Sequence, residues 1–226
     1  MLRISDEWRE AYPRAVVGIL AMGNVSNPSG HTELDERKRE LERGLRDHFG
    51  GRDRAELRAI PPLDAYHAYF KRFKKTYPVQ LQLESVVYKK QSIPHVAALV
   101  EAMFMAELSN LLLTAAHDLD TIEQPLTLDV SQGNERYTRL NGSEQDLKAG
   151  DMIMKDSLGI IASVAYGPDW RTRLTDSTQR VLFVTYGVPG ISADAIREHL
   201  EDIQTNVRLL TPEAETELVK LYGVHV

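Results

Sequence analysis

The run Leu126-Thr-Leu-Asp-Val130 alternates apolar and polar residues, which is typical of a β-strand with one buried face. It marks the point at which the pattern of the chain changes. Helix-like segments fill the middle of the chain before it, and three further strand-like runs follow it, at residues 151–155, 159–165 and 180–186. This order predicts an α+β fold whose sheet is mixed or antiparallel in its later part.

The first half of the chain opens with an apolar, β-branched run at residues 15–22, which predicts a buried strand. A helix is expected over residues 32–49, with Thr32 and Asp35 as a capping box and Gly50 just after its end. Further helices are expected at residues 63–77, 79–90 and 95–113.

The last part of the chain is expected to contain one helix, one strand and a second helix. Ser192 is a suitable N-cap for a helix that runs to about Gln204. Residues 207–210 are apolar enough for a last strand. Thr211-Pro212-Glu213 then predicts the start of a closing helix, because proline favours the first helical position.

Composition limits the class of protein. The chain has 226 residues, 42% hydrophobic and 27% charged, which predicts a single folded domain over residues 1–226. A formal net charge of −6 excludes a whole-surface basic attraction to nucleic acid, and the absence of cysteine excludes disulfides and thiolate chemistry. The charged N-terminus and the lack of an apolar run of ~18–20 residues predict a cytoplasmic protein without a membrane span.

The stretch over residues 63–77 interleaves aromatic and basic side chains. Its aromatic residues at positions 66, 69, 70 and 73 have the i, i+3, i+4, i+7 spacing of a buried helical stripe. The same stretch carries four cations that form a candidate RNA-binding patch, Lys71, Arg72, Lys74 and Lys75. The alternative is that these cations are only the solvated face of the helix.

Common catalytic motifs are absent from the sequence, which contains no P-loop, no G-x-S-x-G and no H-E-x-x-H. His117 stands beside Asp118, and Asp120 follows, so an imidazole lies next to carboxylates. A His-Asp pair also occurs in metal-dependent phosphohydrolases, but those need further ligands, and apart from His95 upstream no second set is marked. We therefore expect no metal ion and no cofactor.

An ordered series of short motifs indicates a family. Leu119-Asp120-Thr121-Ile122 leads into the strand at 126–130, and the other motifs are Ala65-Tyr66 and residues 92–101 upstream, then Leu140-Asn141-Gly142, residues 152–156 and residues 175–182. The series resembles the B3/B4 region of the bacterial phenylalanyl-tRNA synthetase beta subunit, and more closely the free-standing proteins built from that region. The resemblance covers residues 63–187. It implies a B3/B4-type α+β domain, with a mixed sheet and flanking helices.

The resemblance also implies a function. In the family this region hydrolyses wrongly charged tyrosyl-tRNA, because a hydrophobic pocket alone cannot reject a near-isostere. The implied partner is therefore tRNA or aminoacyl-tRNA, and the implied activity is trans-editing hydrolysis of a mischarged aminoacyl-tRNA. The alternative is a non-catalytic RNA- or amino-acid-binding module that has lost the editing site.

Several polar positions of the family's site differ in this chain. Ala115 stands where the family has histidine, Met103 and Phe104 replace a Thr-Asn pair, and Trp170 replaces a glutamate. The pocket is therefore expected to be apolar, to lack a partner for a phenolic hydroxyl, and to show no preference for tyrosyl over phenylalanyl esters.

The resemblance places the pocket between the helix with Met103 and the strands around residues 156–170. The candidate catalytic residues are His117, Asp118 and Asp169, with His117 activating water and an aspartate positioning water or the α-ammonium group. The candidate substrate-binding residues are Met103, Phe104, Ala115, Asp156, Trp170 and Arg171, and Arg173 is a further candidate for phosphate or carboxylate groups. The alternative for His117 and Asp118 is that they only pin a turn.

Overall fold

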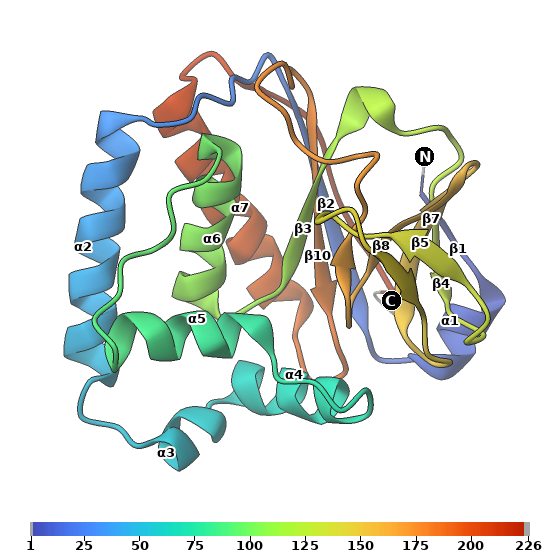
Figure 1. Cartoon of the computed structure of the whole chain (residues 1–226), viewed down its shortest axis with the longest axis horizontal. Coiled ribbons are helices and arrows are strands. Elements are labelled where there is room, and N and C mark those ends of the chain that lie inside the picture. Colours follow the sequence, from blue (N-terminus) through green and yellow to red (C-terminus); the bar gives the residue numbers. More distant parts are fainter. Residues whose placement is uncertain (1, 224–226) are drawn as a thin grey trace.

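The structure is a computed structural model that describes residues 2–223. A layer of helices covers one side of a central sheet, and a second, smaller sheet lies on the other side (Figure 1). The helices are α1 Asp6–Ala11, α2 Thr32–Phe49, α3 Arg54–Arg58, α4 Pro61–Lys71, α5 Pro78–Val87, α6 Ala98–Asn110 and α7 Ala193–Leu210, with the 3-10 turn η1 Leu119–Thr121.

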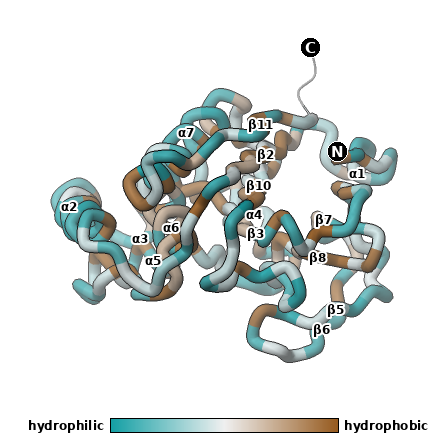
Figure 2. Tube along the Cα trace, turned by 90° about the horizontal axis from the view of Figure 1, so that it is seen from above, coloured by the Kyte–Doolittle hydropathy of each residue, from teal (hydrophilic) through white to brown (hydrophobic). Residues whose placement is uncertain are grey.

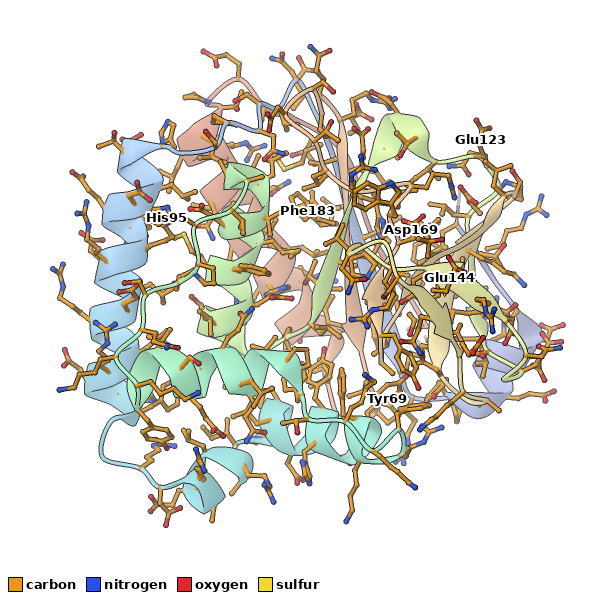
Figure 3. All side chains as sticks on the ribbon, viewed as in Figure 1. Tyr69, His95, Glu123, Glu144, Asp169 and Phe183 are labelled. Atoms are coloured by element: carbon orange, nitrogen blue, oxygen red, sulfur yellow. The ribbon has the colours of Figure 1, made fainter. Side chains whose placement is uncertain are left out.

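The central sheet is antiparallel throughout, with the order β11-β2-β10-β3. Its strands are β2 Val16–Gly23, β3 Thr114–Asp118, β10 Val181–Gly187 and β11 Glu215–Tyr222. Every residue of β2 and β10 is buried, which explains why β2 is a continuous apolar run and why β10 is interrupted only by Thr185. Phe183 of β10 is fully buried at the centre, opposite Leu20 and Ala116 (Figure 3). Strand β3 ends the sheet on one side.

The second sheet is mixed, with the order β1-β4-β7-β8-β9, and a separate ribbon pairs β5 with β6. Strand β1 runs parallel to β4, and the other neighbours are antiparallel. The strands are β1 Arg3–Ile4, β4 Thr127–Val130, β5 Arg136–Thr138, β6 Glu144–Asp146, β7 Met152–Asp156, β8 Gly159–Ser163 and β9 Gly167–Pro168. The predicted α+β fold with a mixed sheet and flanking helices is confirmed.

Helices α6 and α7 pack against each other, and α2 lies outside them. The outer α2 is largely hydrophilic, whereas the central strands are hydrophobic (Figure 2). Helix α7 lies close to β2 because residue 18 is a glycine: a Cβ there would collide with Ile196. The buried apolar side chains of the main core run from Leu2 to Ala214. That residues 1–226 are one domain stays a prediction.

Helix α2 has the predicted bounds, but its predicted cap is wrong. The N-cap is His31, which makes no side-chain capping bond. A complete capping box instead begins α3, where Asp53 accepts hydrogen bonds from the backbone of Ala55 and Glu56 and the Glu56 side chain accepts one from Asp53.

The helix expected over residues 63–77 is shorter in the structure, where α4 ends at Lys71. The aromatic stripe is buried as expected. The chain then turns, and Lys74 adopts a left-handed conformation with a φ of 57°. The four cations therefore do not form one helical face.

Two predictions for the C-terminal part are wrong, namely the strand at residues 207–210 and the closing helix that begins at Thr211. Helix α7 continues to Leu210, because Ile203, Val207 and Leu210 extend the apolar face that starts at Ile196. The helix ends before Pro212, and the chain then forms strand β11, which pairs with β2, rather than a closing helix. Within residues 2–223, none of the helices has both the length and the apolar character to span a membrane.

A buried ion pair ties α2 to α6. The ammonium group of Lys38 contacts the carboxylate of Glu101, and it also lies 2.9 Å from Asp35 Oδ1 and 3.3 Å from His95 Nδ1. His95 lies beside α2 in Figure 3. The side chains of Lys38 and Glu101 are only 4% and 1% exposed. Asp35, His95 and Glu101 have the spacing of a metal site, but Lys38 supplies the cation that faces all three.

We expect Glu101→Ala to lower the free energy of unfolding by about 3 kcal/mol, because it leaves a buried ammonium with fewer partners. The matched control is Asp146→Ala, which breaks the exposed ion pair with Arg136 and should cost less than about 1 kcal/mol. Urea unfolding of the three proteins measures both effects. Equal, small losses in the two variants would contradict the structural role of the Lys38–Glu101 pair.

Candidate ligand-binding pocket

A pocket lies at the edge strand β3, where the helical layer meets the second sheet. Its volume is about 650 Å³. Helices α5 and α6, the start of β3 and the segment from Ser163 to Pro168 all contribute lining residues. This volume lies within the ~300–1,000 Å³ range of small-molecule sites in proteins.

Helix α6 presents one face to this pocket. Val100, Met103, Phe104 and Glu107 follow the i, i+3, i+4, i+7 spacing of a single helical stripe, and all four line the pocket. Ala115 lines it from β3, where a small side chain leaves the space open. The predicted pocket residues Met103, Phe104 and Ala115 are thus brought together.

Glu107 is a buried acid in this apolar wall. Its side chain is buried, and Oε1 accepts a hydrogen bond from the Thr114 backbone N–H at 2.7 Å. Oε2 makes no hydrogen bond to any residue in the described part of the chain. Burial raises the pKa of Glu107 to about 8, although the Thr114 bond opposes this shift. The carboxyl group is therefore mainly neutral at pH 7.

Tyr186 of β10 also lines the pocket. Its hydroxyl is buried without a hydrogen-bond partner among residues 2–223. Burial raises the pKa of this hydroxyl, and the charges of Asp151 and Tyr137 raise it further, so the hydroxyl lies toward the second sheet. Glu107 adds an acid to a pocket that was expected to be apolar, and the expectation that the pocket lacks a partner for a phenolic hydroxyl stays a prediction.

Three cationic side chains line the pocket and are half-buried, so they lie toward its open side: Lys75, Arg139 and Arg173. The ammonium of Lys75 stands 4.5 Å from the centre of the Tyr166 ring. Burial lowers the pKa of Lys75, and the charges of Arg139 and Lys148 lower it further. The Arg173 guanidinium lies 3.7 Å from the ring centre of Trp170, which is 45% exposed. Such a group of cations attracts an anion.

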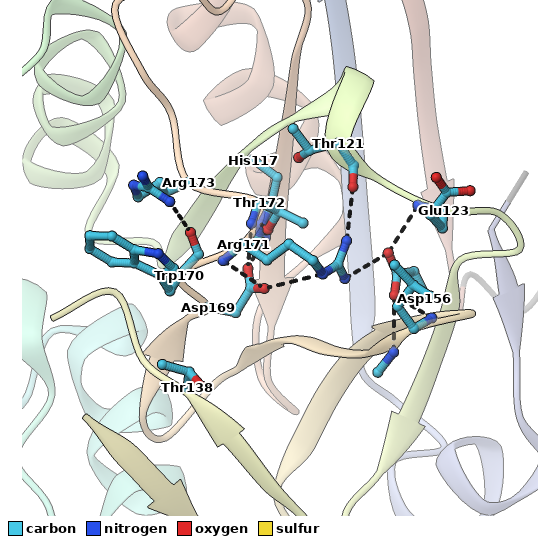
Figure 4. Close-up of polar contacts among 12 residues, drawn as sticks. His117, Thr121, Glu123, Thr138, Asp156, Asp169, Trp170, Arg171, Thr172 and Arg173 are labelled. Atoms are coloured by element: carbon cyan, nitrogen blue, oxygen red, sulfur yellow. Dashed lines mark hydrogen bonds and ion pairs between the residues drawn. The ribbon is translucent and has the colours of Figure 1, made fainter. Parts of the chain in front are cut away.

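The other candidate catalytic and substrate-binding residues do not line this pocket. Four of them, His117, Asp156, Asp169 and Arg171, belong to one network of polar contacts (Figure 4). His117 is fully buried, and its Nδ1 lies 2.7 Å from the Thr172 hydroxyl. The Thr172 hydroxyl donates to Asp169, so Nδ1 of His117 carries the hydrogen and Nε2 is left as an acceptor without a partner among the described residues. Burial, together with the charge of Arg171, lowers the pKa of His117 to about 3.

Asp118 and Asp169 both accept hydrogen bonds within turns. Asp118 accepts from the Asp120 backbone at 3.1 Å and from the Thr178 hydroxyl at 2.7 Å. Asp169 accepts from the backbone N–H groups of Arg171 and Thr172. Burial raises the pKa of Asp169 against these bonds. These contacts match the turn-pinning alternative for Asp118.

Arg171 joins η1 to the turn between β7 and β8. It donates to the Thr121 carbonyl and to Asp156 Oδ2, each at 2.8 Å. Asp156 also accepts backbone bonds from Glu123, Leu158 and Gly159, and these bonds with Arg171 hold its pKa low against the effect of burial. Both oxygens of Asp156 are thus already used.

The four predicted RNA-binding cations have different surroundings. Lys75 lines the pocket, whereas Lys71, at the end of α4, and Lys74, in the turn that follows, are exposed and are not lining residues. Arg72 donates to the hydroxyl of Tyr12 and to the carbonyl of Gly150, each at 3.1 Å, and also lies over three aromatic rings. Its guanidinium is therefore held by packing contacts.

Sequence reasoning did not single out Glu107, Tyr186 or Arg139. One signal was available for Glu107, because a glutamate four residues after Met103 lies on the same face of an apolar helix. The tyrosine lies in a strand that reads as core. Arg139 follows a short strand of the β5–β6 ribbon, and only the tertiary fold brings it near Lys75.

The fold and the pocket together define an α+β domain with a ligand-sized cavity at the edge of its central sheet. The model of the B3/4 domain family matches residues 64–208, which is more than half of the chain, so the chain belongs to the B3/4 domain family. The match confirms the family that the ordered motifs indicate, and it extends beyond the predicted core of 63–187.

Among solved structures, the chain is similar to an N-terminal fragment of the phenylalanyl-tRNA synthetase beta-subunit from Pyrococcus horikoshii. The identity is 11% and the TM-score is 0.48; the match covers 98% of this chain and 50% of that chain. The chain thus spans about half the length of that fragment. No curated protein matches this chain.

The pH dependence of stability provides a check on Glu107. In the folded chain its carboxyl group keeps its proton up to about pH 8, whereas the ordinary pKa is 4.5. Unfolding therefore releases a proton between these values, and the free energy of unfolding falls as the pH rises, by at most about 1.4 kcal/mol per pH unit. The stability that the protonated Glu107 carboxyl group contributes is fully present below about pH 4.5 and is lost by about pH 8.

We expect Glu107→Gln to remove this fall, because the amide oxygen can still accept the Thr114 bond but cannot ionise. From pH 5 to pH 8, the free energy of unfolding of wild type should fall relative to that of the variant. Urea unfolding across this range measures it. Parallel pH profiles for the two proteins would show that Glu107 titrates normally.

Proposed function

We propose that this B3/4 domain recognises the aminoacyl end of a charged tRNA in the cytoplasm. The amino-acid side chain occupies the apolar part of the pocket, and the phosphates near the tRNA 3′ end lie at its open side. The observation that carries the proposal is the arrangement of charge: an apolar pocket of about 650 Å³ has three half-buried cations on its lining.

The pocket walls fit an apolar amino-acid side chain. Met103, Phe104 and Ala115 offer only apolar surface, and Leu113 and Val164 continue it on either side. Burial of an apolar ligand group there is favourable by about 25 cal/mol for each Å² removed from water. Because the pocket also contains the acid Glu107, its selectivity among amino acids depends on this group as well as on its shape.

The geometry supports recognition more directly than hydrolysis. His117, Asp118 and Asp169 were the expected catalytic residues, but none of them lines the pocket. They are hydrogen-bonded instead to Thr172, to Thr178 and to the backbone of a turn. An acid–base group must come within hydrogen-bond reach of the water or proton that it transfers. We therefore base the proposal on binding, and deacylation is the second readout of its test.

We expect Lys75→Gln, Arg139→Gln and Arg173→Gln each to weaken the binding of aminoacyl-tRNA by about fivefold, the equivalent of ~1 kcal/mol. Each change should also reduce the slope of log K against log salt by ~0.7, because one single-stranded phosphate contact is lost. The matched control is Lys71→Gln, which removes an exposed cation of the same basic run away from the pocket lining. Fluorescence anisotropy at several salt concentrations measures both quantities.

The same preparation is tested with a panel of charged tRNAs and with uncharged tRNA. Tighter binding of charged tRNA supports the proposal, and release of the amino acid would add hydrolysis to it. Equal binding of charged and uncharged tRNA, or a loss of affinity in the Lys71 variant as large as in the three pocket variants, would contradict it.

A further inference from the structure

Glu107 is the feature of the pocket that recognition of an apolar side chain leaves unexplained. Among residues 2–223, four glutamates are buried: Glu42, Glu84, Glu101 and Glu107. The first three have cationic partners, in Arg46, Arg54 and Lys38 respectively. Glu107 makes no ion pair with any described residue, and it is the one of the four that lines the pocket.

An ionised carboxylate in this position is costly without a cation. Desolvation of an unpaired buried charge costs several kcal/mol, and one backbone hydrogen bond does not offset that cost. The Oε2 atom of Glu107 makes no hydrogen bond within the described chain, so a ligand can supply the missing partner. A positively charged ligand group would satisfy both the charge and this oxygen.

We propose that Glu107 binds the primary ammonium group of the ligand, so that the protein selects an aminoacyl ester with a free α-amino group and rejects an N-acylated one. This assignment rests on the proposed function, because it deepens the description of the same pocket. The assignment also orients the ligand in the pocket, because Glu107 is buried whereas the cations Lys75, Arg139 and Arg173 are half-buried. An ammonium is attracted inward and a phosphate outward.

Glu107 fits a donor of an ammonium group. A primary ammonium has three N–H donors. Glu107 Oε2 can accept one of them in a charge-assisted hydrogen bond. An acetylated nitrogen has one donor, no charge and a larger volume, so it cannot replace the ammonium at this acid.

Other titratable groups near Glu107 do not neutralise it. The phenols of Tyr66, from α4, and Tyr77, just before α5, are affected by its charge, and burial raises the pKa values of both. Their hydroxyls donate to the carbonyls of Tyr186 and Leu111 respectively. On the far side of Thr114, the buried His199 has its pKa lowered to about 3 by desolvation. These groups are neutral at pH 7.

Proton exchange follows from this arrangement. In the empty pocket Glu107 is protonated below its pKa of about 8. When an ammonium binds, the carboxylic acid loses its proton to solvent, and the carboxylate–ammonium pair remains. At pH 6 about one proton is released, whereas at pH 9 about one is taken up, because the carboxylate is then already ionised and the α-amine, with a pKa of ~7.7–8.0, is neutral.

The test uses CCA trinucleotides that carry leucine or phenylalanine through a non-hydrolysable 3′-amide. Matched probes have the α-amine acetylated or replaced by hydrogen. Isothermal titration calorimetry in two buffers with different ionisation enthalpies gives both the affinity and the number of protons released. The proteins are the full chain and its Glu107→Gln variant, whose fold is checked by thermal unfolding.

We expect wild type to bind the free-amine probes at least ~10-fold more tightly than the matched probes, with about one proton released at pH 6. Glu107→Gln should lose both the preference and the proton release. The proton count on wild type provides a test that does not depend on the variant's fold.

Equal binding of the free-amine and deaminated probes would overturn the assignment of Glu107 and leave the proposed function intact. A preference for the amine that persists in Glu107→Gln, or binding without proton release at pH 6, would also overturn it. Failure of every probe to bind would overturn the proposed function together with the assignment.

Discussion

Strand β10 hydrogen-bonds to β2 on one side and to β3 on the other, and the position of the pocket depends on this pairing. Because β10 is buried along its whole length, its register with β3 is fixed by the core. That register sets where β3 begins and therefore where Ala115 lies. Helix α6 leads into β3 through Leu111, whose left-handed conformation ends the helix and turns the chain. Glu107 and Ala115 thus meet at one cavity.

The polar groups of the interior fall into two kinds. Asp156 and Asp169 make several contacts that fasten loops to the second sheet, and these contacts account for their burial. His117 keeps its Nε2 without a partner among the described residues, but it does not line the cavity. Glu107 is buried with an unused carboxylate oxygen, and it does line the cavity. Unused capacity beside a cavity, rather than the residue type, separates a group that can meet a ligand from one that supports the fold.

The sequence predicted the parts of this structure that local patterns control. The α+β class, the bounds of α2 and the burial of the aromatic stripe follow from periodicity. Strand β11 was missed because it is an exposed edge strand whose residues lack an apolar alternation, so it depends on β2 for its pairing. Met103, Phe104 and Ala115 came from the family's motif order, whereas the approach of Arg139 to Lys75 is a property of the tertiary structure.

The pairing of β2 with β10 and β11 has a consequence for synthesis. A chain leaves the ribosome from its N-terminal side, so β2 emerges well before its two hydrogen-bonding neighbours, β10 and β11. Until they arrive, an apolar strand that is buried along its full length in the native sheet has two open edges. The nascent polypeptide must therefore be shielded or kept apart from other chains until β10 and β11 have been synthesised, because the sheet cannot close before then.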